Sequence, residues 1–254
     1  MSTRLLLVVL IVFAAAAERA GTQSAPVIRG LNGSWEAYPL RGEGFGSGIP
    51  PRIAVPRPAP VPEPPLKSPY LEEWRAQQKR AAELTAQGLP PVTTGMACIG
   101  EGMPAMMQAT FPMEILETPG RVTIIQEAYN QVRRVYLDEA APAPEEAEPR
   151  FAGNSTGRWQ GDTLIIETVG VKESVRFRNV PHSPKMRITE RLRLINDEIL
   201  ENQVTVEDPE YLTKPWTWPW MYKRWPDYRI QEYVCEDNRY FEDPERRYQR
   251  LKVN

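Results

Sequence analysis

The sequence contains one histidine, His182, and two cysteines, Cys98 and Cys235. One imidazole cannot build a multi-histidine metal site, and cysteines this far apart do not provide the short ligand spacing of a zinc site. We therefore expect no metal site and no cofactor.

The sequence also lacks a large excess of positive or negative charge, since it contains 31 Lys and Arg residues and 33 Asp and Glu residues. Nucleic-acid-binding domains concentrate basic side chains in a patch or stripe. The balanced composition therefore predicts no nucleic-acid partner.

Long hydrophobic runs are confined to the N-terminus. Residues 1–17 carry Arg4, an apolar run and three alanines at positions 15–17, the pattern of a cleaved signal peptide. This run is too short to be a membrane anchor, and no later run is long enough to span a bilayer. We expect an exported, soluble protein in the periplasm or outside the cell, with no membrane span.

Export determines how the two cysteines are interpreted, since disulfides persist outside the cytoplasm. We predict a disulfide between Cys98 and Cys235; two buried free thiols are the alternative. Closing so long a loop would stabilise the fold by about 4 to 5 kcal/mol in the chain-entropy model.

Composition divides the chain after the signal peptide into two parts. Residues 18–67 are rich in proline and glycine, and residues 56–65 cannot sustain a helix or a central strand. We interpret this segment as an extended arm, either a tether or a Pro-rich ligand for an envelope partner. Residues 68–254 are predicted to form one domain that begins with a helix over 68–87, capped by Ser68 and resting on the sheet or on one barrel end.

Strand signals then recur at short intervals, with turns at Pro119-Gly120 and Gly161-Asp162. This spacing favours a mainly β fold: an antiparallel meander that closes into a lipocalin-like barrel or a strongly curved sheet. Residues 228–235 are expected to form a last strand and residues 243–251 a short C-terminal helix. The clearest strands are expected over residues 113–118, 121–127, 131–138, 186–194 and 199–207.

Glu190 breaks the pattern of its strand. Alternate side chains of a strand point to opposite faces, and Glu190 falls on the apolar face, between Ile188 and Leu192. In the following strand, Asn202 shares a face with Leu200 and Val204. Because an unpaired buried carboxylate costs several kcal/mol, Glu190 needs either a structural partner or a functional role.

Arg134 is a candidate partner for Glu190, because it shares a strand face with Val132 and Tyr136 and could point inward. A second feature is the run of Trp216, Trp218 and Trp220, which would lie on one side of an extended segment. These indoles could stack on a sugar or an aromatic ligand, or pack as core at the barrel mouth.

Three functions are compatible with these patterns. The first is binding of a small apolar or aromatic ligand in the barrel interior. The second is an acid–base enzyme, such as an isomerase, lyase or hydrolase, with Glu190 and His182 as catalytic residues. The third is a structural, envelope-associated protein that finds a partner through the arm. The candidate ligand-binding residues are Arg134, Tyr136, Asn202, Trp216 and Trp218.

Several motifs resemble those of an uncharacterised family of exported bacterial proteins, over about residues 96–238. The chain departs from the family pattern at Arg187, where histidine is frequent. The resemblance supports a single domain and the use of both cysteines, and it implies no reaction. The matching motifs are Gly157-Arg158-Trp159-Gln160-Gly161-Asp162-Thr163-Leu164, Pro181-His182-Ser183, Thr189-Glu190-Arg191-Leu192-Arg193, Asp208-Pro209 and Thr213-Lys214-Pro215-Trp216.

Overall fold

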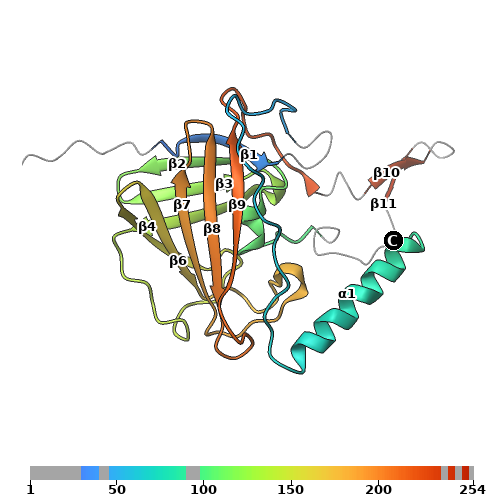
Figure 1. Cartoon of the computed structure of the whole chain (residues 1–254). Coiled ribbons are helices and arrows are strands. Elements are labelled where there is room, and N and C mark those ends of the chain that lie inside the picture. Colours follow the sequence, from blue (N-terminus) through green and yellow to red (C-terminus); the bar gives the residue numbers. More distant parts are fainter. Residues whose placement is uncertain (1–29, 40–45, 90–97, 236–239, 244–247, 252–254) are drawn as a thin grey trace, which may run out of the picture.

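The structure is a computed structural model that describes residues 30–39, 46–89, 98–235, 240–243 and 248–251. The predicted signal peptide, residues 1–17, lies outside the described residues. Nine strands form a closed barrel in the order of the sequence (Figure 1). The prediction of a mainly β, barrel-forming chain is therefore confirmed. The barrel strands are β1 (Gly33–Tyr38), β2 (Met113–Thr118), β3 (Arg121–Gln126), β4 (Gln131–Leu137), β5 (Asn154–Gln160), β6 (Thr163–Val169), β7 (Arg187–Leu194), β8 (Ile199–Glu207) and β9 (Trp216–Arg224).

The two predicted turns are present and are built as their sequences require. Gly120, after Pro119, has a φ of +73°, and it connects β2 to β3. Gly161 has a φ of +64° and, with Asp162, makes the two-residue connection from β5 to β6. A positive φ at the first of two central residues is the requirement of a type II′ hairpin turn, which glycine meets without steric cost.

One strand pair departs from the predicted antiparallel meander. β4 and β5 are parallel, and they pair over three residues of each strand, from Val135↔Ser155 to Leu137↔Gly157. The chain returns to the start of β5 through residues 138–153, as a parallel pair requires. At Gly157 the two strands come close, since a Cβ there would lie 2.8 Å from Val135 Cγ1.

The barrel begins earlier than the predicted domain boundary at residue 68. β1 lies inside the segment interpreted as an arm, and it closes the barrel by pairing with both β2 and β9. It therefore has a neighbouring strand on each side, and its Trp35 is completely buried in the core. The described part of the arm after β1, residues 46–67, runs along the outside of the barrel (Figure 1).

The end of the arm is bound to the barrel by main-chain hydrogen bonds. Lys67 N donates to Tyr211 O, and Thr213 N donates to Pro65 O, both at 2.8 Å. Trp216 Nε1 also donates to Pro62 O at 3.0 Å. This part of the arm is therefore a strap over the barrel, of which the sequence predicts only the extended conformation.

The helix α1 (Tyr70–Ala86) agrees with the predicted range, but none of its residues is buried. It projects away from the barrel (Figure 1), and its contact is made near its start, where Trp74 Nε1 donates to Arg178 O at 2.8 Å. The expectation that it lies against the sheet is wrong, because its apolar residues are concentrated in the first turns. The predicted Ser68 cap is wrong too: Pro69 occupies the cap position, without a side-chain hydrogen bond.

The C-terminal predictions are wrong in their secondary structure. Residues 228–235 form no strand, and β10 (Tyr240–Asp243) pairs with β11 (Tyr248–Leu251) where a helix was expected. Aromatic residues favour strands, and the pairing supplies main-chain hydrogen bonds that a short isolated helix would have to provide alone. The disulfide between Cys98 and Cys235 is confirmed.

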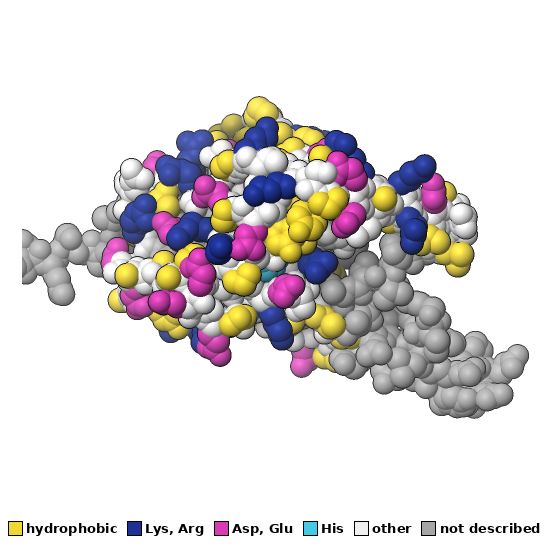
Figure 2. All heavy atoms as spheres, turned by 90° about the horizontal axis from the view of Figure 1, so that it is seen from below, with side chains coloured by type: hydrophobic (Ala, Val, Ile, Leu, Met, Phe, Trp, Pro, Cys, Tyr) yellow, Lys and Arg dark blue, Asp and Glu magenta, His cyan; other side chains and the backbone are white. Residues whose placement is uncertain are grey.

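The surface carries both signs of charge. On the face seen in Figure 2, basic and acidic side chains are interspersed and do not form a continuous basic stripe. Within the part of the chain that the structure describes, no helix has the length and apolar character that crossing a bilayer demands.

Candidate functional site

The tryptophans of β9 are part of the packed barrel interior. Trp216, Trp218 and Trp220 are all buried on the inward face, as their alternation predicts. They surround Phe177 of the 3-10 turn η4 (Phe177–Asn179), whose ring stacks on Trp218 at a centroid distance of 5.3 Å. Their surfaces are thus occupied by core contacts, which is the second of the two roles considered for them.

A series of polar side chains crosses this apolar interior, and we call it the polar belt. It contains one inward residue from each of six consecutive strands, β4 to β9. Hydrogen bonds join the members into one network, in which Thr168 and Glu190 are linked through Arg133 and the other neighbours are bonded directly. Its members are Arg133, Ser155, Thr168, Glu190, Asn202 and Tyr222.

Glu190 is the centre of the polar belt and is 0 % exposed. One carboxylate oxygen accepts a hydrogen bond from Arg133 Nη2, and the other accepts one from Asn202 Nδ2 at 2.9 Å. Arg133 also donates to Ser155 Oγ at 3.1 Å and to Thr168 Oγ1 at 2.8 Å. The buried charge of Glu190 is therefore neutralised by Arg133 and also bound by one neutral donor, Asn202.

The other end of the polar belt is tied to a segment outside the sheet. Tyr222 OH donates to Met107 O at 2.5 Å, in the 3-10 turn η2 (Ala105–Gln108). Met106 and Met107 of this turn are buried in the core. The belt thus connects the strands of the barrel to the turn η2, whose methionines fill part of the barrel interior.

The prediction that Arg134 could face Glu190 is wrong by one residue, since the inward arginine is Arg133. Val132 and Tyr136 lie on the outer face of β4, 42 % and 41 % exposed, and Arg134 is exposed with them. β4 carries apolar residues on both faces, so alternation alone does not say which face is inside. Pairing with β3 places Arg133 beside the buried Ile124 and decides the matter.

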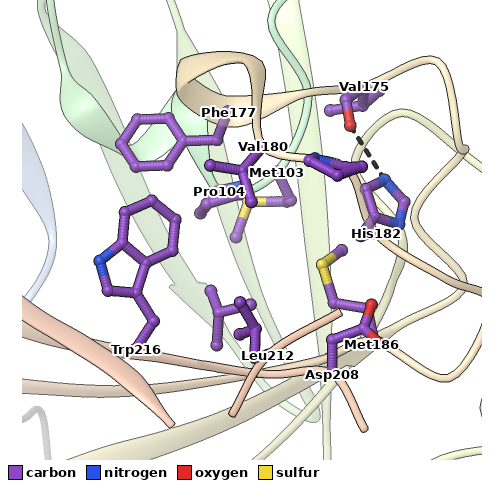
Figure 3. Close-up of a pocket in the computed structure, with 12 residues that line it drawn as sticks. Met103, Pro104, Val175, Phe177, Val180, His182, Met186, Asp208, Leu212 and Trp216 are labelled. Atoms are coloured by element: carbon purple, nitrogen blue, oxygen red, sulfur yellow. Dashed lines mark hydrogen bonds between the residues drawn. The ribbon is translucent and has the colours of Figure 1, made fainter. Parts of the chain in front are cut away.

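His182 lies apart from Glu190, in a loop at one end of the barrel. It is buried, and its Nε2 is 2.9 Å from Val175 O (Figure 3). It lines a cavity of about 20 Å³, with Met186 and Trp216 among the other walls, which is room for about one water molecule. Glu190 does not line this cavity and shares no hydrogen-bond partner with His182, so the structure does not assemble the predicted catalytic pair.

Asp208 holds the His182 loop, a role that the sequence did not reveal. Its carboxylate accepts hydrogen bonds from Ser183 N at 2.6 Å, Ser183 Oγ at 3.0 Å and Glu210 N at 2.9 Å. The Pro181-His182-Ser183 and Asp208-Pro209 motifs therefore meet in one structural clamp. Their spacing in the sequence gives no sign of this contact.

A larger hollow lies at the junction of β4 and β5, and we call it the seam hollow. Its volume is about 530 Å³. Arg134 and Tyr136, both candidate ligand-binding residues, line it from the outer face of β4; the other candidates, Asn202, Trp216 and Trp218, do not. The remaining walls are Met106, Gln131, Val132, Glu139, Ala140, Pro142, Arg150, Phe151, Ala152, Gly153, Asn154, Ser155 and Thr156.

The two arginines that line the seam hollow, Arg134 and Arg150, differ in their hydrogen bonding. Arg150 is bound by Glu148, and this hydrogen bond is the main reason why the pKa of the Arg150 guanidinium is raised. Arg134 makes no hydrogen bond or ion pair with any residue that the structure describes. Arg134 is thus the cation of the hollow that a bound anion could recruit.

The seam hollow also reaches the polar belt. Ser155 is a wall of the hollow, and its Oγ contacts both Arg133 Nε and Thr168 Oγ1. The buried Met106, another wall of the hollow, belongs to the same turn as Met107, whose carbonyl accepts the hydrogen bond from Tyr222. The hollow is therefore the place where a bound molecule could meet the interior network.

No group of three or more His, Cys, Asp or Glu side chains within the described ranges is placed to hold a metal ion. The chain matches no protein-family model, and no curated protein is detectably similar to it in sequence. The fold and the geometry above are therefore the basis for any statement on function.

Proposed function

We propose that this chain is an exported binding protein whose ligand is a small molecule with an apolar or aromatic body and a carboxylate, held in the seam hollow. The observation that carries the proposal is the combination of a hollow of about 530 Å³ with an unengaged guanidinium, that of Arg134. Small-molecule sites typically enclose about 300 to 1,000 Å³ and place a few polar groups among apolar walls.

The walls support this ligand chemistry. Val132, Tyr136 and Phe151 are large apolar or aromatic side chains with substantial exposure, and all three line the hollow. Aromatic rings bury a large area and stack on flat ligands. A guanidinium binds a carboxylate through two parallel hydrogen bonds. Arg134 would therefore orient the acid, while the rings cover the body of the ligand.

The seam hollow is not the site that the sequence suggested, which was the barrel interior. Phe177, Met107 and the β9 tryptophans pack this interior, and both oxygens of Glu190 are already bound by protein donors. The seam hollow offers space without the removal of core side chains. We therefore place the ligand there.

Two alternatives are weaker on the same grounds. An acid–base enzyme would need Glu190 and His182 at one substrate, and these residues contact different partners in different places. A structural, envelope-associated protein is favoured by the packed interior, but it leaves the seam hollow without a role. Export itself is supported by the N-terminal pattern and by the disulfide, which fits an oxidising compartment.

The test is ligand binding by the mature, disulfide-bonded protein. Native mass spectrometry would identify any acid that co-purifies, and calorimetry with 3-phenylpropionate and related aromatic carboxylates would measure affinity. Arg134→Gln should weaken binding about tenfold or more, because a charge-assisted pair contributes about 1.5 to 3 kcal/mol.

Arg191→Gln is the matched control, since Arg191 is an exposed arginine of β7 that does not line the hollow. It should leave the affinity unchanged. Equal effects of the two substitutions, or no binding of any aromatic carboxylate, would contradict the proposal.

A further inference from the structure

We propose that the ligand of the seam hollow contains an extended peptide segment, which pairs as an added strand with the free edge of β4. This inference rests on the proposed function and specifies its ligand class. The partner is a short peptide with an acidic group near Arg134 and an apolar or aromatic residue near Tyr136 and Phe151.

The free edge follows from the strand register. β4 pairs with β3 over Gln131 to Tyr136, but it pairs with β5 only from Val135 to Leu137. The first half of β4 therefore has a neighbour on one side. The seam hollow occupies the other side, where Phe151, Ala152, Gly153 and Asn154 form the opposite wall.

The direction of the main-chain groups can be derived from two hydrogen bonds. Leu137 N donates to Gly120 O on the β3 side, and Asp138 N donates to Gly157 O on the β5 side. Successive residues of a strand direct their N–H and C=O groups to opposite sides. The main-chain groups of Val132 and Arg134 are therefore directed to the open side.

Three of these groups, the N–H and C=O of Val132 and the N–H of Arg134, have no hydrogen-bond partner among the described residues. The C=O of Arg134 is engaged, because the parallel pair Val135↔Ser155 is made through a hydrogen bond from Ser155 N to Arg134 O. Gln131, also in the wall, contributes a further donor: its Oε1 accepts from Gly102 N, and its buried Nε2 has no described partner. A strand edge with free N–H and C=O groups is the template for peptide recognition by strand addition.

The side chains of the hollow suit such a strand. Val132, Arg134 and Tyr136 lie on one face of β4, so they would flank the outward side chains of an added strand. Ser155 and Met106 would meet side chains on its inner face. Main-chain bonds would supply affinity, and the pair of Arg134 with an acid would set the register.

The first experiment compares ligands that differ in main-chain amides. The capped peptide acetyl-Thr-Val-Phe-Val-Glu-amide should bind at least about tenfold more tightly than 3-phenylpropionate, a factor equal to about 1.4 kcal/mol. N-methylation of the alternate amides that face β4 should remove this gain. Each of the two alternate sets is methylated in turn, because the orientation of the added strand is not assumed.

The outcomes separate this inference from the proposed function. If 3-phenylpropionate binds as tightly as the peptide, or if neither methylated set weakens binding, the peptide inference is overturned and the small-molecule site stands. If neither ligand binds, both fail. Arg134→Gln should weaken both ligands, and Arg191→Gln neither.

A second experiment measures amide hydrogen exchange along the free edge of β4. In the free protein, the amide of Val132 should exchange with solvent at least about a hundredfold faster than that of Val135, whose amide points to β3. The peptide should slow exchange at Val132 and Arg134, whereas 3-phenylpropionate should not. Protection of Val132 in the free protein equal to that of Val135 would contradict the open edge.

Discussion

Arg133 on β4 and Glu190 on β7 are hydrogen-bonded to each other inside the barrel, although β5 and β6 separate their strands. Both side chains are almost completely buried. Ser155 and Thr168, on the two intervening strands, also bind the guanidinium. The pair therefore ties four strands together on the side of the barrel where β4 and β5 share only a short ladder.

The first prediction concerns this pair. Arg133→Leu should lower the free energy of unfolding by about 3 to 5 kcal/mol, because it leaves the Glu190 carboxylate buried without its cation. The double substitution Arg133→Leu with Glu190→Leu should recover much of the loss, since neither charge remains. Urea unfolding of the three proteins measures both effects. Single and double variants of equal stability would show that the pair is not coupled in this way.

The second prediction concerns the disulfide. Cys98→Ser with Cys235→Ser should destabilise the protein by up to about 4 to 5 kcal/mol, because the open chain regains conformational entropy on unfolding. A thiol assay on the denatured, unreduced wild type should find no free thiol. Detection of two reactive thiols would contradict the bond.

The third prediction concerns alkaline pH. Burial, followed by the neighbouring Tyr233, raises the pKa of Tyr129 to about 12 from its ordinary value of 10.0. Burial and the hydrogen bond to Glu127 also raise the pKa of Tyr228. Above pH 10 the unfolded state loses these protons before the folded state does, so stability should fall from about pH 10 to 12.

This dependence is measured by urea unfolding at a series of pH values. Below pH 9 both tyrosines stay protonated in the folded and unfolded states, so they should not make the free energy of unfolding depend on pH. Tyr129→Phe and Tyr228→Phe should each reduce the slope above pH 10, because phenylalanine does not ionise. An unchanged slope in the double variant would assign the alkaline loss to other groups.

The fourth prediction concerns the Asp208 clamp. Asp208→Ala leaves Ser183 N and Glu210 N without their acceptor and should cost about 1 to 3 kcal/mol. Asp208→Asn keeps one acceptor oxygen and should cost less. Urea unfolding measures the loss, and affinity for the seam hollow should stay the same, since Asp208 does not line it. An alanine variant as stable as wild type would show that the clamp contributes little.

The inward positions of β7 and β8 could be read from the sequence, because each strand has one clearly apolar face. Glu190 and Asn202 were predicted to share the interior, and both are fully buried and hydrogen-bonded to each other. β4 was different. With Val132 outside and Val135 inside, both of its faces look apolar, so its sequence does not distinguish the inward Arg133 from the outward Arg134.

The seam hollow could not have been predicted from these patterns. It depends on the parallel pairing of β4 with β5, and that pairing depends on how residues 138–153 return along the barrel. Arg134 and Tyr136 were named as ligand-binding candidates because they were expected to face inward. They line the hollow because they face outward.

By itself, the sequence determined local features: the ranges of β2, β3, β4, β7 and β8, the two glycine turns, and the burial of one acid among apolar neighbours. These depend on residues close together in the chain, whose spacing carries the period of a strand and the φ that a turn requires. Only the tertiary structure decided which arginine neutralises Glu190, that His182 lies elsewhere, and where the barrel wall opens. Those outcomes depend on the register between strands distant in sequence, which no single segment encodes.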